Sequence, residues 1–391
     1  MSEKNSEESS DASIVVQAPE RPANSPMAKI KHVIAIGSGK GGVGKSTTAT
    51  NIAVALAKLG AKVGLMDADI YGPSIPKMLG NNDQPKQSPE GKVLPIEVHG
   101  IKAMSMGFLG GDAPTVWRGP MASKAVNQFL SEVQWGELDY LIVDLPPGTG
   151  DIQITLAQTA RLSGAVIVMT PQVLASAIAM RGLKMFQQVR VPVIGLIENM
   201  SHYECPKCGH HENIFRSGGG DSVAKELHVP LLGQIPLDPK IVEESDEGNP
   251  VVLSRPDSPQ AKIYIDIAKA FVKELRNVVQ GKREGAPLQI VNVEPNVKGK
   301  VAKISWNDGK QSLARFKDLR LLCPCAVCVD EDTGVRKIKD SDIDPEVQPM
   351  SIQSVGNYAI KIKWSDKHDT GIYSYDYLRR ALHGKEDQKT K

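Results

Sequence analysis

The stretch Gly39–Ser46, which reads GKGGVGKS, is the feature that most restricts what this chain can fold into. It lies between an apolar run, Val33–Ile36, and an alanine-rich segment, Thr47–Leu59, and it fits the pattern GxxxxGK[ST]. In that context a strand leads into a loop whose main-chain N–H groups close around phosphate oxygens, and a helix follows. The sequence therefore predicts a phosphate-binding loop, with a glycine-rich turn that binds nothing as the alternative.

The side chains of this loop have separate expected roles. Lys45 is expected to reach the outer phosphates of a nucleotide, and the hydroxyl of Ser46 to ligate Mg²⁺. A second lysine within the loop, Lys40, is unusual. The residues of the loop expected to bind the nucleotide are Gly39, Lys40, Gly41, Gly42, Val43, Gly44, Lys45, Ser46 and Thr47.

Apolar runs typical of strands alternate with helical patterns in the first two thirds of the chain. Continuous runs of Val, Ile and Leu separated by helices indicate a mostly parallel sheet covered by helices on both faces, which is an α/β fold. Ser258 and Pro259 open a last helix whose apolar residues share one face. The expected strands are Val33–Ile36, Val63–Met66, Tyr140–Val143, Ala165–Thr170, Val193–Ile197 and Leu231–Ile235.

Acidic residues follow two of these strands. Asp67 and Asp69 come after Val63–Met66, and Asp144 comes after Tyr140–Val143. Because the carboxyl ends of parallel strands face the ligand crevice, these carboxylates should converge on the loop. We expect Asp144 to hold Mg²⁺ through water and Asp69 to orient the attacking water. A helix-capping or turn carboxylate is the alternative for each, and for Asp69 alone it is equally plausible.

Composition divides the chain into a large and a small domain with polar segments around them. Residues 1–28 read as a disordered tail, 29–280 as the nucleotide-binding domain, 281–287 as a linker, 288–385 as a small α+β domain, and 386–391 as a second tail. The small domain repeats itself, because the segment beginning at Val301 aligns with the one beginning at Ala359 and Trp306 matches Trp364. Each copy reads as strand, turn, strand and short helix.

The charge and the cysteine content limit the partners. A formal net charge of +2 gives no global field that recruits nucleic acid or anionic lipid, and no apolar run reaches the length of a membrane-spanning helix. The first 28 residues fit neither a secretory signal nor a transit peptide, so we expect a cytoplasmic protein. The five cysteines form two clusters, which in a reducing compartment favours metal binding over disulfides.

Several further motifs follow the phosphate-binding loop along the chain, and their order is typical of one protein family. Together they resemble the Mrp/Nbp/ApbC iron-sulfur carriers, a group of deviant phosphate-loop ATPases related to MinD and the nitrogenase iron protein, over residues from about 30 to 275. The motifs are KGGVGKST, MDADIYGPSIPKMLG, WRGPM at Trp117, VDLPPGTGD at Val143, TPQ at Thr170 and ENMSHYECPKCG at Glu198.

The resemblance implies roles that the residues alone do not give. It implies that Lys40 reaches across a homodimer to the nucleotide of the partner, and that Asn199, with the segment around Pro236, contacts adenine. It also implies that Asp69 lies in switch I and Asp144 in the Walker B strand.

Cys205 and Cys208 form the motif CPKCG after the strand Val193–Ile197. A tetrahedral thiolate site needs four ligands, and the large domain has only this pair of cysteines, which suggests that a second chain completes the site. A [4Fe-4S] cluster bridging two protomers satisfies the count, and the resemblance implies the same. The competing interpretation is a zinc site completed by His202, His210 or His211.

Cys323, Cys325 and Cys328 form CPCAVC after the short helix of the first repeat, and His368 lies in the turn of the second. Cys₃His is a normal closed zinc site. This region resembles the small N-terminal domain of gamma-butyrobetaine hydroxylases, which implies that the four residues bind Zn²⁺. A second iron-sulfur ligand set or a redox-active thiol cluster is the alternative.

These features favour an ATP-dependent protein that carries an iron-sulfur cluster and transfers it to apo client proteins, with slow ATP hydrolysis as the switch. It would receive the cluster from a donor protein. A positioning ATPase of the MinD or ParA kind is a second hypothesis, but the chain does not end in a basic amphipathic helix. A zinc-containing regulatory ATPase is a third. The sequence does not decide whether the small domain selects clients, docks a donor or stabilises the dimer.

Overall fold

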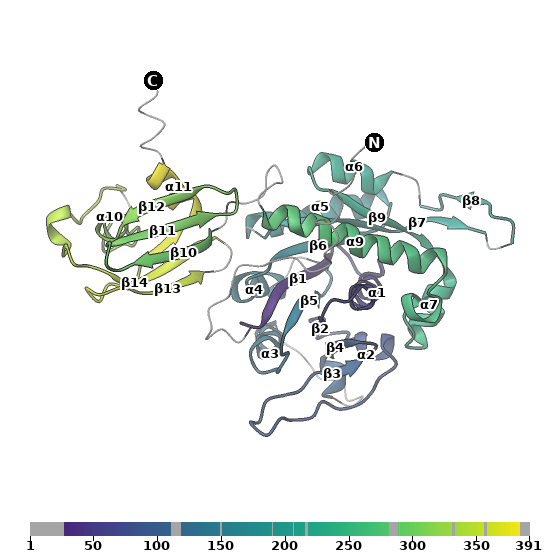
Figure 1. Ribbon diagram of the computed structural model, residues 1–391. Helices are drawn as coiled ribbons and strands as arrows, with labels where there is room; N and C mark the ends of the chain where they lie inside the picture. The colour runs from purple at the N-terminus through teal and green to yellow at the C-terminus, as the bar shows by residue number, and fades with distance from the viewer. Residues whose placement is uncertain are drawn as a thin grey trace, which may run out of the picture. The chain divides into compact units, whose positions relative to one another are not determined.

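The glycine-rich loop follows the central strand of a large sheet in the computed structural model (Figure 1). The structure describes residues 27–110, 119–148, 151–189, 191–205, 207–215, 218–280, 288, 290–330, 333–355 and 358–383. The predicted linker and nearly all of the two predicted tails lie outside these residues, as do Trp117 and the end of the turn after Asp144. The described residues divide into two compact units, one up to Arg276 and the other from Asn277 onward.

The first unit confirms the expected α/β fold. Its strands follow the order β3-β4-β2-β5-β1-β6-β7-β8, and β9 also pairs with β7. All pairings are parallel except β3 with β4 and β7 with β8. The strands are β1 Ile30–Ser38, β2 Val63–Asp67, β3 Ile96–Val98, β4 Ile101–Met104, β5 Leu138–Asp144, β6 Gly164–Met169, β7 Val193–Glu204, β8 His211–Glu212 and β9 Leu231–Leu237.

Helices cover this sheet on both faces. Core residues of α3, α4, α5 and α6 cluster with strand residues such as Val33 and Val143. Tyr140, which alternation places on the opposite face, contacts Phe271 of α9 edge to face. The helices are α1 Lys45–Lys58, α2 Ile75–Met78, α3 Gly119–Ser131, α4 Asp151–Thr159, α5 Val173–Gln188, α6 Gly219–Glu226, α7 Pro239–Asp246, α8 Val251–Ser254 and α9 Pro259–Val279, with a 3-10 turn at Met106–Phe108.

The second unit is built from two similar halves. Each half has a three-stranded antiparallel sheet followed by a helix, β10-β11-β12 with α10 and β13-β14-β15 with α11. Their bounds are β10 Ile290–Asn296, β11 Val301–Trp306, β12 Gln311–Arg315, α10 Phe316–Leu321, β13 Pro349–Val355, β14 Ala359–Trp364, β15 Ile372–Ser374 and α11 Tyr375–His383, with a 3-10 turn at Asp340–Asp342.

The two matched tryptophans show how far the repeat extends. Trp306 and Trp364 each end the middle strand of a sheet, and both belong to one buried core. The indole N–H of Trp306 donates to Ser312 on the next strand, and that of Trp364 donates to Tyr373 on its next strand. The halves therefore share their topology and this anchoring bond, as the internal repeat predicts.

Candidate functional site

The phosphate loop leaves β1 and runs directly into α1. Gly42 and Gly44 have φ angles of 74° and 77°, a left-handed conformation that turns successive N–H groups into one concave surface. Gly44 is the N-cap of α1, so the positive end of that helix lies behind the loop. The local backbone is therefore that of an anion-binding loop.

The carboxyl ends of β2 and β5 bring the predicted acids to this loop, which follows β1. Asp67 and Asp144 are register partners on β2 and β5, and Asp144 also pairs with Ile36 on β1. The Nζ of Lys45 donates to Asp144 Oδ1 at 2.5 Å, with both side chains buried, and to Ser46 Oγ at 3.2 Å. The second oxygen of Asp144, Oδ2, is buried and has no hydrogen-bond partner among the described residues.

The other two carboxylates lie in different surroundings. Burial raises the pKa of Asp67 to about 7, with the charge of Asp144 as a further cause, although Ser105 donates a hydrogen bond to its Oδ2 at 2.9 Å. Asp69 is half-buried, and burial raises its pKa too; the charge of Lys45 opposes this rise, whereas that of Asp144 adds to it. The charges of Lys45 and Asp144 therefore act on Asp69, although the described contacts include no ion pair between Asp69 and Lys45.

Lys40 and Asn199 make contacts within this chain that the sequence did not indicate. The Nζ of Lys40 donates to Gln172 Oε1 at 2.6 Å. The amide of Asn199, at 9% exposure, donates to the Val43 carbonyl at 2.8 Å and so holds the loop from β7. Pro236 is buried on β9, next to Ile235, the register partner of Asn199. The predicted roles of Lys40, Asn199 and Pro236 toward a partner chain and adenine stay predictions.

Cys205 and Cys208 lie at the tip of a hairpin. The strand that precedes them is longer than expected, because β7 continues past Ile197 to Glu204 and pairs there with β8. The Cys205 N–H donates to the His210 carbonyl at 2.9 Å and the Gly209 N–H to the Cys205 carbonyl at 2.8 Å, which closes the tip. Backbone N–H groups of Lys207 and Cys208 lower the pKa of the Cys205 thiol, and Cys208 is exposed. Solvent therefore reaches Cys208 fully and Cys205 in part.

Comparison with known proteins bears on this combination of loop and hairpin. The family model of the NUBPL iron-transfer P-loop NTPases matches residues 29–272. The chain belongs to this family. A separate model, of the N-terminal region of gamma-butyrobetaine hydroxylase-like proteins, matches residues 293–379.

Relatives of this NUBPL-type NTPase carry names that agree with the family. An iron-sulfur cluster carrier protein of Salmonella typhimurium is 54% identical over 248 residues, which are 63% of this chain and 67% of that protein. The mouse iron-sulfur cluster transfer protein NUBPL is 49% identical over 259 residues, 66% of this chain and 81% of the relative. A solved nucleotide-binding protein of Archaeoglobus fulgidus in complex with ADP is 38% identical, covers 61% of this chain and 94% of its own, and has a TM-score of 0.54.

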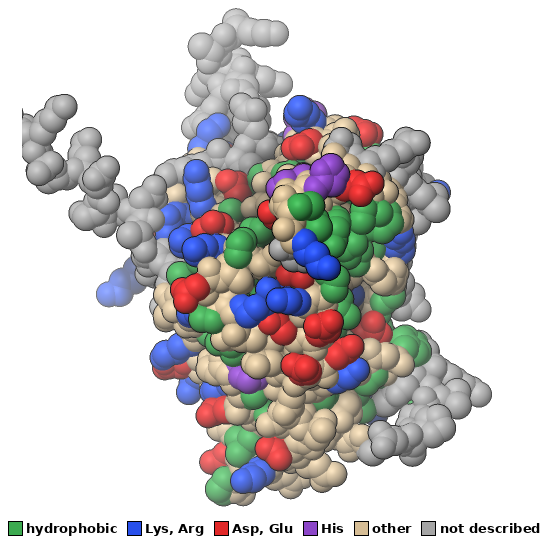
Figure 2. All heavy atoms as spheres, turned by 90° about the vertical axis from the view of Figure 1, so that its right-hand side faces the viewer, with side chains coloured by type: hydrophobic (Ala, Val, Ile, Leu, Met, Phe, Trp, Pro, Cys, Tyr) green, Lys and Arg blue, Asp and Glu red, His purple; other side chains and the backbone are tan. Residues whose placement is uncertain are grey.

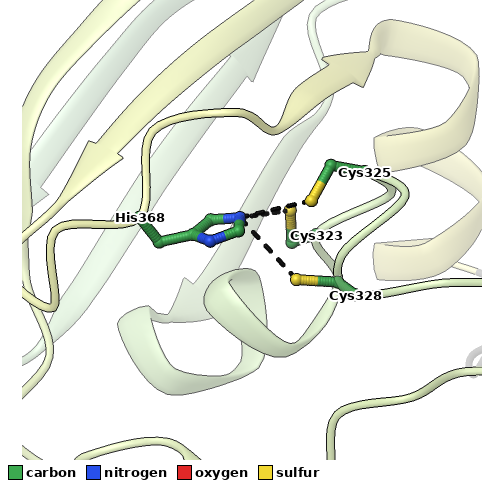
Figure 3. A group of neighbouring side chains, drawn as sticks. All are labelled: Cys323, Cys325, Cys328 and His368. Carbon is green, nitrogen blue, oxygen red and sulfur yellow. Dashed lines mark hydrogen bonds between the residues drawn. The ribbon is translucent and has the colours of Figure 1, made fainter.

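The second unit of this NUBPL-type NTPase holds a distinct group of ligand side chains. Cys323, Cys325, Cys328 and His368 offer four ligand atoms within 4.8 Å of one another, and the described residues contain no second group of three or more His, Cys, Asp or Glu side chains this close (Figure 3). The distances from His368 Nε2 to the three sulfur atoms are 3.1, 3.4 and 3.7 Å. Cys205 and Cys208 therefore have no histidine ligand atom gathered with them to form such a group among the described residues.

The repeat explains why His368 lies there. The main-chain N–H of Trp364 donates to the His368 carbonyl, just as the main-chain N–H of Trp306 donates to the Lys310 carbonyl in the first half. The turn after Trp364 thus has the same form, and it brings His368 to the CPCAVC loop that follows α10.

Arg320 contacts this group from outside. Its Nη1 lies 3.5 Å from Cys328 Sγ, and its Nε donates to Asp366 at 2.7 Å. Arg320 and Asp366 therefore support the Cys₃His group from outside it. The spacing of the cysteines and the histidine in the sequence did not predict this support.

The thiols of this group differ in acidity. Burial raises the pKa of Cys323 to about 12. Burial acts in the same direction on Cys325, but hydrogen bonds from Thr370 and the Cys328 backbone outweigh it and lower the pKa to about 6. Cys325 is therefore a stronger acid than Cys323. The part of the chain that the structure describes has no helix long and apolar enough to cross a membrane.

Proposed function

We propose that this protein carries an iron-sulfur cluster between two copies of its chain and transfers it to apo acceptor proteins. The Cys205–Cys208 pair, half-buried at Cys205 and exposed at Cys208, carries the proposal, because no third ligand side chain gathers with it among the described residues. A cluster with four thiolate positions would then take two cysteines from each copy. The family and the names of its relatives support the same cargo.

The loop residues fit a nucleotide with Mg²⁺ and would act as the switch. Lys45, now paired with Asp144, would turn to the outer phosphates of ATP. Ser46 would ligate Mg²⁺, and Asp144, whose Oδ2 lacks a hydrogen-bond partner among the described residues, would hold it through water. Asp69 would orient the attacking water. Lys40 would leave Gln172 and contact the nucleotide of the partner copy, so that slow hydrolysis changes the arrangement of the dimer.

Zn²⁺ fits the Cys₃His group of the second unit. With Zn–S and Zn–N bonds of ordinary length, a tetrahedral site separates sulfur from nitrogen by about 3.6 Å, and the observed separations are 3.1 to 3.7 Å. Cys323, Cys325, Cys328 and His368 would hold the ion, which would cross-link the two halves of the repeat. Its role is structural, because all four ligand positions are filled by protein.

Anaerobic reconstitution followed by transfer to an apo acceptor tests the proposed function. The wild-type chain should gain iron and sulfide with a visible absorption band, form a dimer and activate the acceptor. Cys205→Ser and Cys208→Ser should lose the band and the transfer, whereas Lys45→Ala should keep the band and lose the response to ATP. Unchanged cluster content in both cysteine variants would refute the assignment of these residues.

A further inference from the structure

The stem of the cysteine hairpin presents three ligand-type side chains on one face. Strands β7 and β8 pair so that Glu204 lies opposite His211 and Tyr203 opposite Glu212. His202 precedes Glu204 by two residues, and side chains at that spacing point to the same side of a strand. His202, Glu204 and His211 therefore share a face, and Tyr203 and Glu212 lie on the other.

The contacts agree with this register. The rings of His202 and His211 stack at a centroid distance of 5.3 Å and an interplanar angle of 29°. The Nε2 of His211 lies 3.6 Å from Glu204 Oε1. In Figure 2, which views the molecule from the side where β8 projects in Figure 1, histidine side chains (purple) gather beside acidic ones (red). His211 and Glu204 are 61% and 48% exposed, so solvent reaches them.

A buried serine contacts one ring nitrogen of His202 and selects its tautomer. The Ser201 hydroxyl donates to the Ile235 carbonyl at 3.1 Å, and its only proton is used there. The same oxygen lies 3.0 Å from His202 Nδ1, and with the hydroxyl proton directed to Ile235 it accepts a hydrogen bond from Nδ1–H. The proton of the neutral imidazole is then on Nδ1, and Nε2 keeps a free lone pair. An outer oxygen that fixes the tautomer in this way is the usual support of a metal-binding histidine.

We propose that His202, Glu204 and His211 form a binding site for a single divalent transition-metal ion, next to the cysteine pair and separate from it. Two imidazoles and one carboxylate suit ferrous iron and similar ions, and they leave positions open for water or other ligands. The Cβ atoms of residues directly opposite each other on paired strands, such as Glu204 and His211, are about 5 Å apart. Those of residues two apart on one strand, such as His202 and Glu204, are about 7 Å apart. Rotation of the exposed His211 and Glu204 side chains can close these distances around one ion. The site takes an ion rather than a cluster and goes beyond the proposed function.

Cobalt(II) titration of the full-length chain tests this site. The background variant is Cys205→Ser with Cys208→Ser, and the Cys₃His group is first loaded with one equivalent of Zn²⁺. Co²⁺ bound by the hairpin should then give visible d–d absorption without a sulfur-to-cobalt charge-transfer band. His211→Asn and Glu204→Gln should each weaken binding about tenfold or more by calorimetry. Ser201→Ala should weaken it by about tenfold because the tautomer of His202 is released.

His210→Asn is the matched control, since His210 is an exposed histidine of the same hairpin outside the paired stem. It should bind Co²⁺ within about twofold of the background protein. Absence of Co²⁺ binding to the background, or equal binding by the background, His211→Asn and Glu204→Gln, would overturn the site. Because the cysteine pair is absent from every protein compared, the result does not depend on whether the chain carries a cluster.

Discussion

The side-chain amide of Asn199 donates a hydrogen bond of 2.8 Å to the main-chain carbonyl of Val43. It joins the phosphate loop to β7, the strand that ends at the cysteine hairpin. The two residues are 156 positions apart in the sequence, yet they fix the loop and the hairpin in one frame.

Replacing Asn199 with alanine should weaken nucleotide binding. The substitution removes a buried hydrogen bond to the loop, a loss of about 1 to 1.5 kcal/mol, or roughly tenfold in affinity. Titration with a fluorescent ADP analogue measures this change. Asn292→Ala, at an exposed position of the second unit, is the control and should bind as the wild type does. Equal affinities of the two variants would show that the bond does not support the loop.

Alanine at Gly44 should be more harmful than alanine at Gly42. Both positions have a left-handed backbone, which costs a residue with a Cβ about 1 to 2 kcal/mol. A Cβ at Gly42 meets nothing within 4 Å, whereas one at Gly44 comes to 2.2 Å from Asn199 Nδ2. Urea unfolding of both variants gives the difference, and Asn199→Ala should recover part of the loss at Gly44 but none at Gly42. Equal loss at both positions would contradict the contact.

Removing Lys45 should destabilise the nucleotide-free protein. Lys45 and Asp144 are 7% and 0% exposed, so Lys45→Ala leaves a buried carboxylate without its counter-charge, at a cost of about 3 kcal/mol or more. The double variant Lys45→Ala with Asp144→Asn should be more stable than Lys45→Ala alone, because it removes the unpaired charge. Denaturant unfolding without nucleotide measures this double-mutant cycle. Stability unchanged by Lys45→Ala would mean that the pair contributes nothing.

Metal removal should unfold the second unit and spare the first. Chelation, or Cys323→Ser, should abolish its cooperative thermal transition, since a structural zinc ion supplies about 10 kcal/mol or more to a small domain. Near-ultraviolet circular dichroism follows Trp306 and Trp364, both buried in that core. Cys208→Ser is the control and should retain both the metal and the transition. Persistence of the transition after complete metal removal would exclude a structural role.

Much of the fold could be predicted because apolar sequence and burial coincide. Val33–Ile36 and Tyr140–Val143 are continuous apolar runs, and every residue of both runs is buried, in β1 and β5. The second part of β7 escaped prediction because its residues, such as His202 and Glu204, are polar. Met200 adds a φ of 57° within that strand, an interruption that alternation of side chains does not reveal.

The site was predictable only where spacing carries the information. Cys323, Cys325 and Cys328 are close in sequence, and the repeat pointed to His368 as the fourth member of the group that the structure brings together. The contacts of Asn199 with Val43 and of Lys40 with Gln172 join distant segments without a charge pair or a shared motif. Only the packing of β7 and β6 beside the loop determines them.

The length of β7 between the phosphate loop and the cysteine hairpin determines how far a movement at the loop displaces the cysteines. From Asn199 to Cys205 the strand advances six residues, a lever of up to about 20 Å. A tilt of about 6° at the loop end would move the cysteine tip by about 2 Å. That displacement is close to the length of one metal–sulfur bond, about 2.3 Å. A motion too small to alter the fold is therefore large enough to decide whether a thiolate stays within bonding distance.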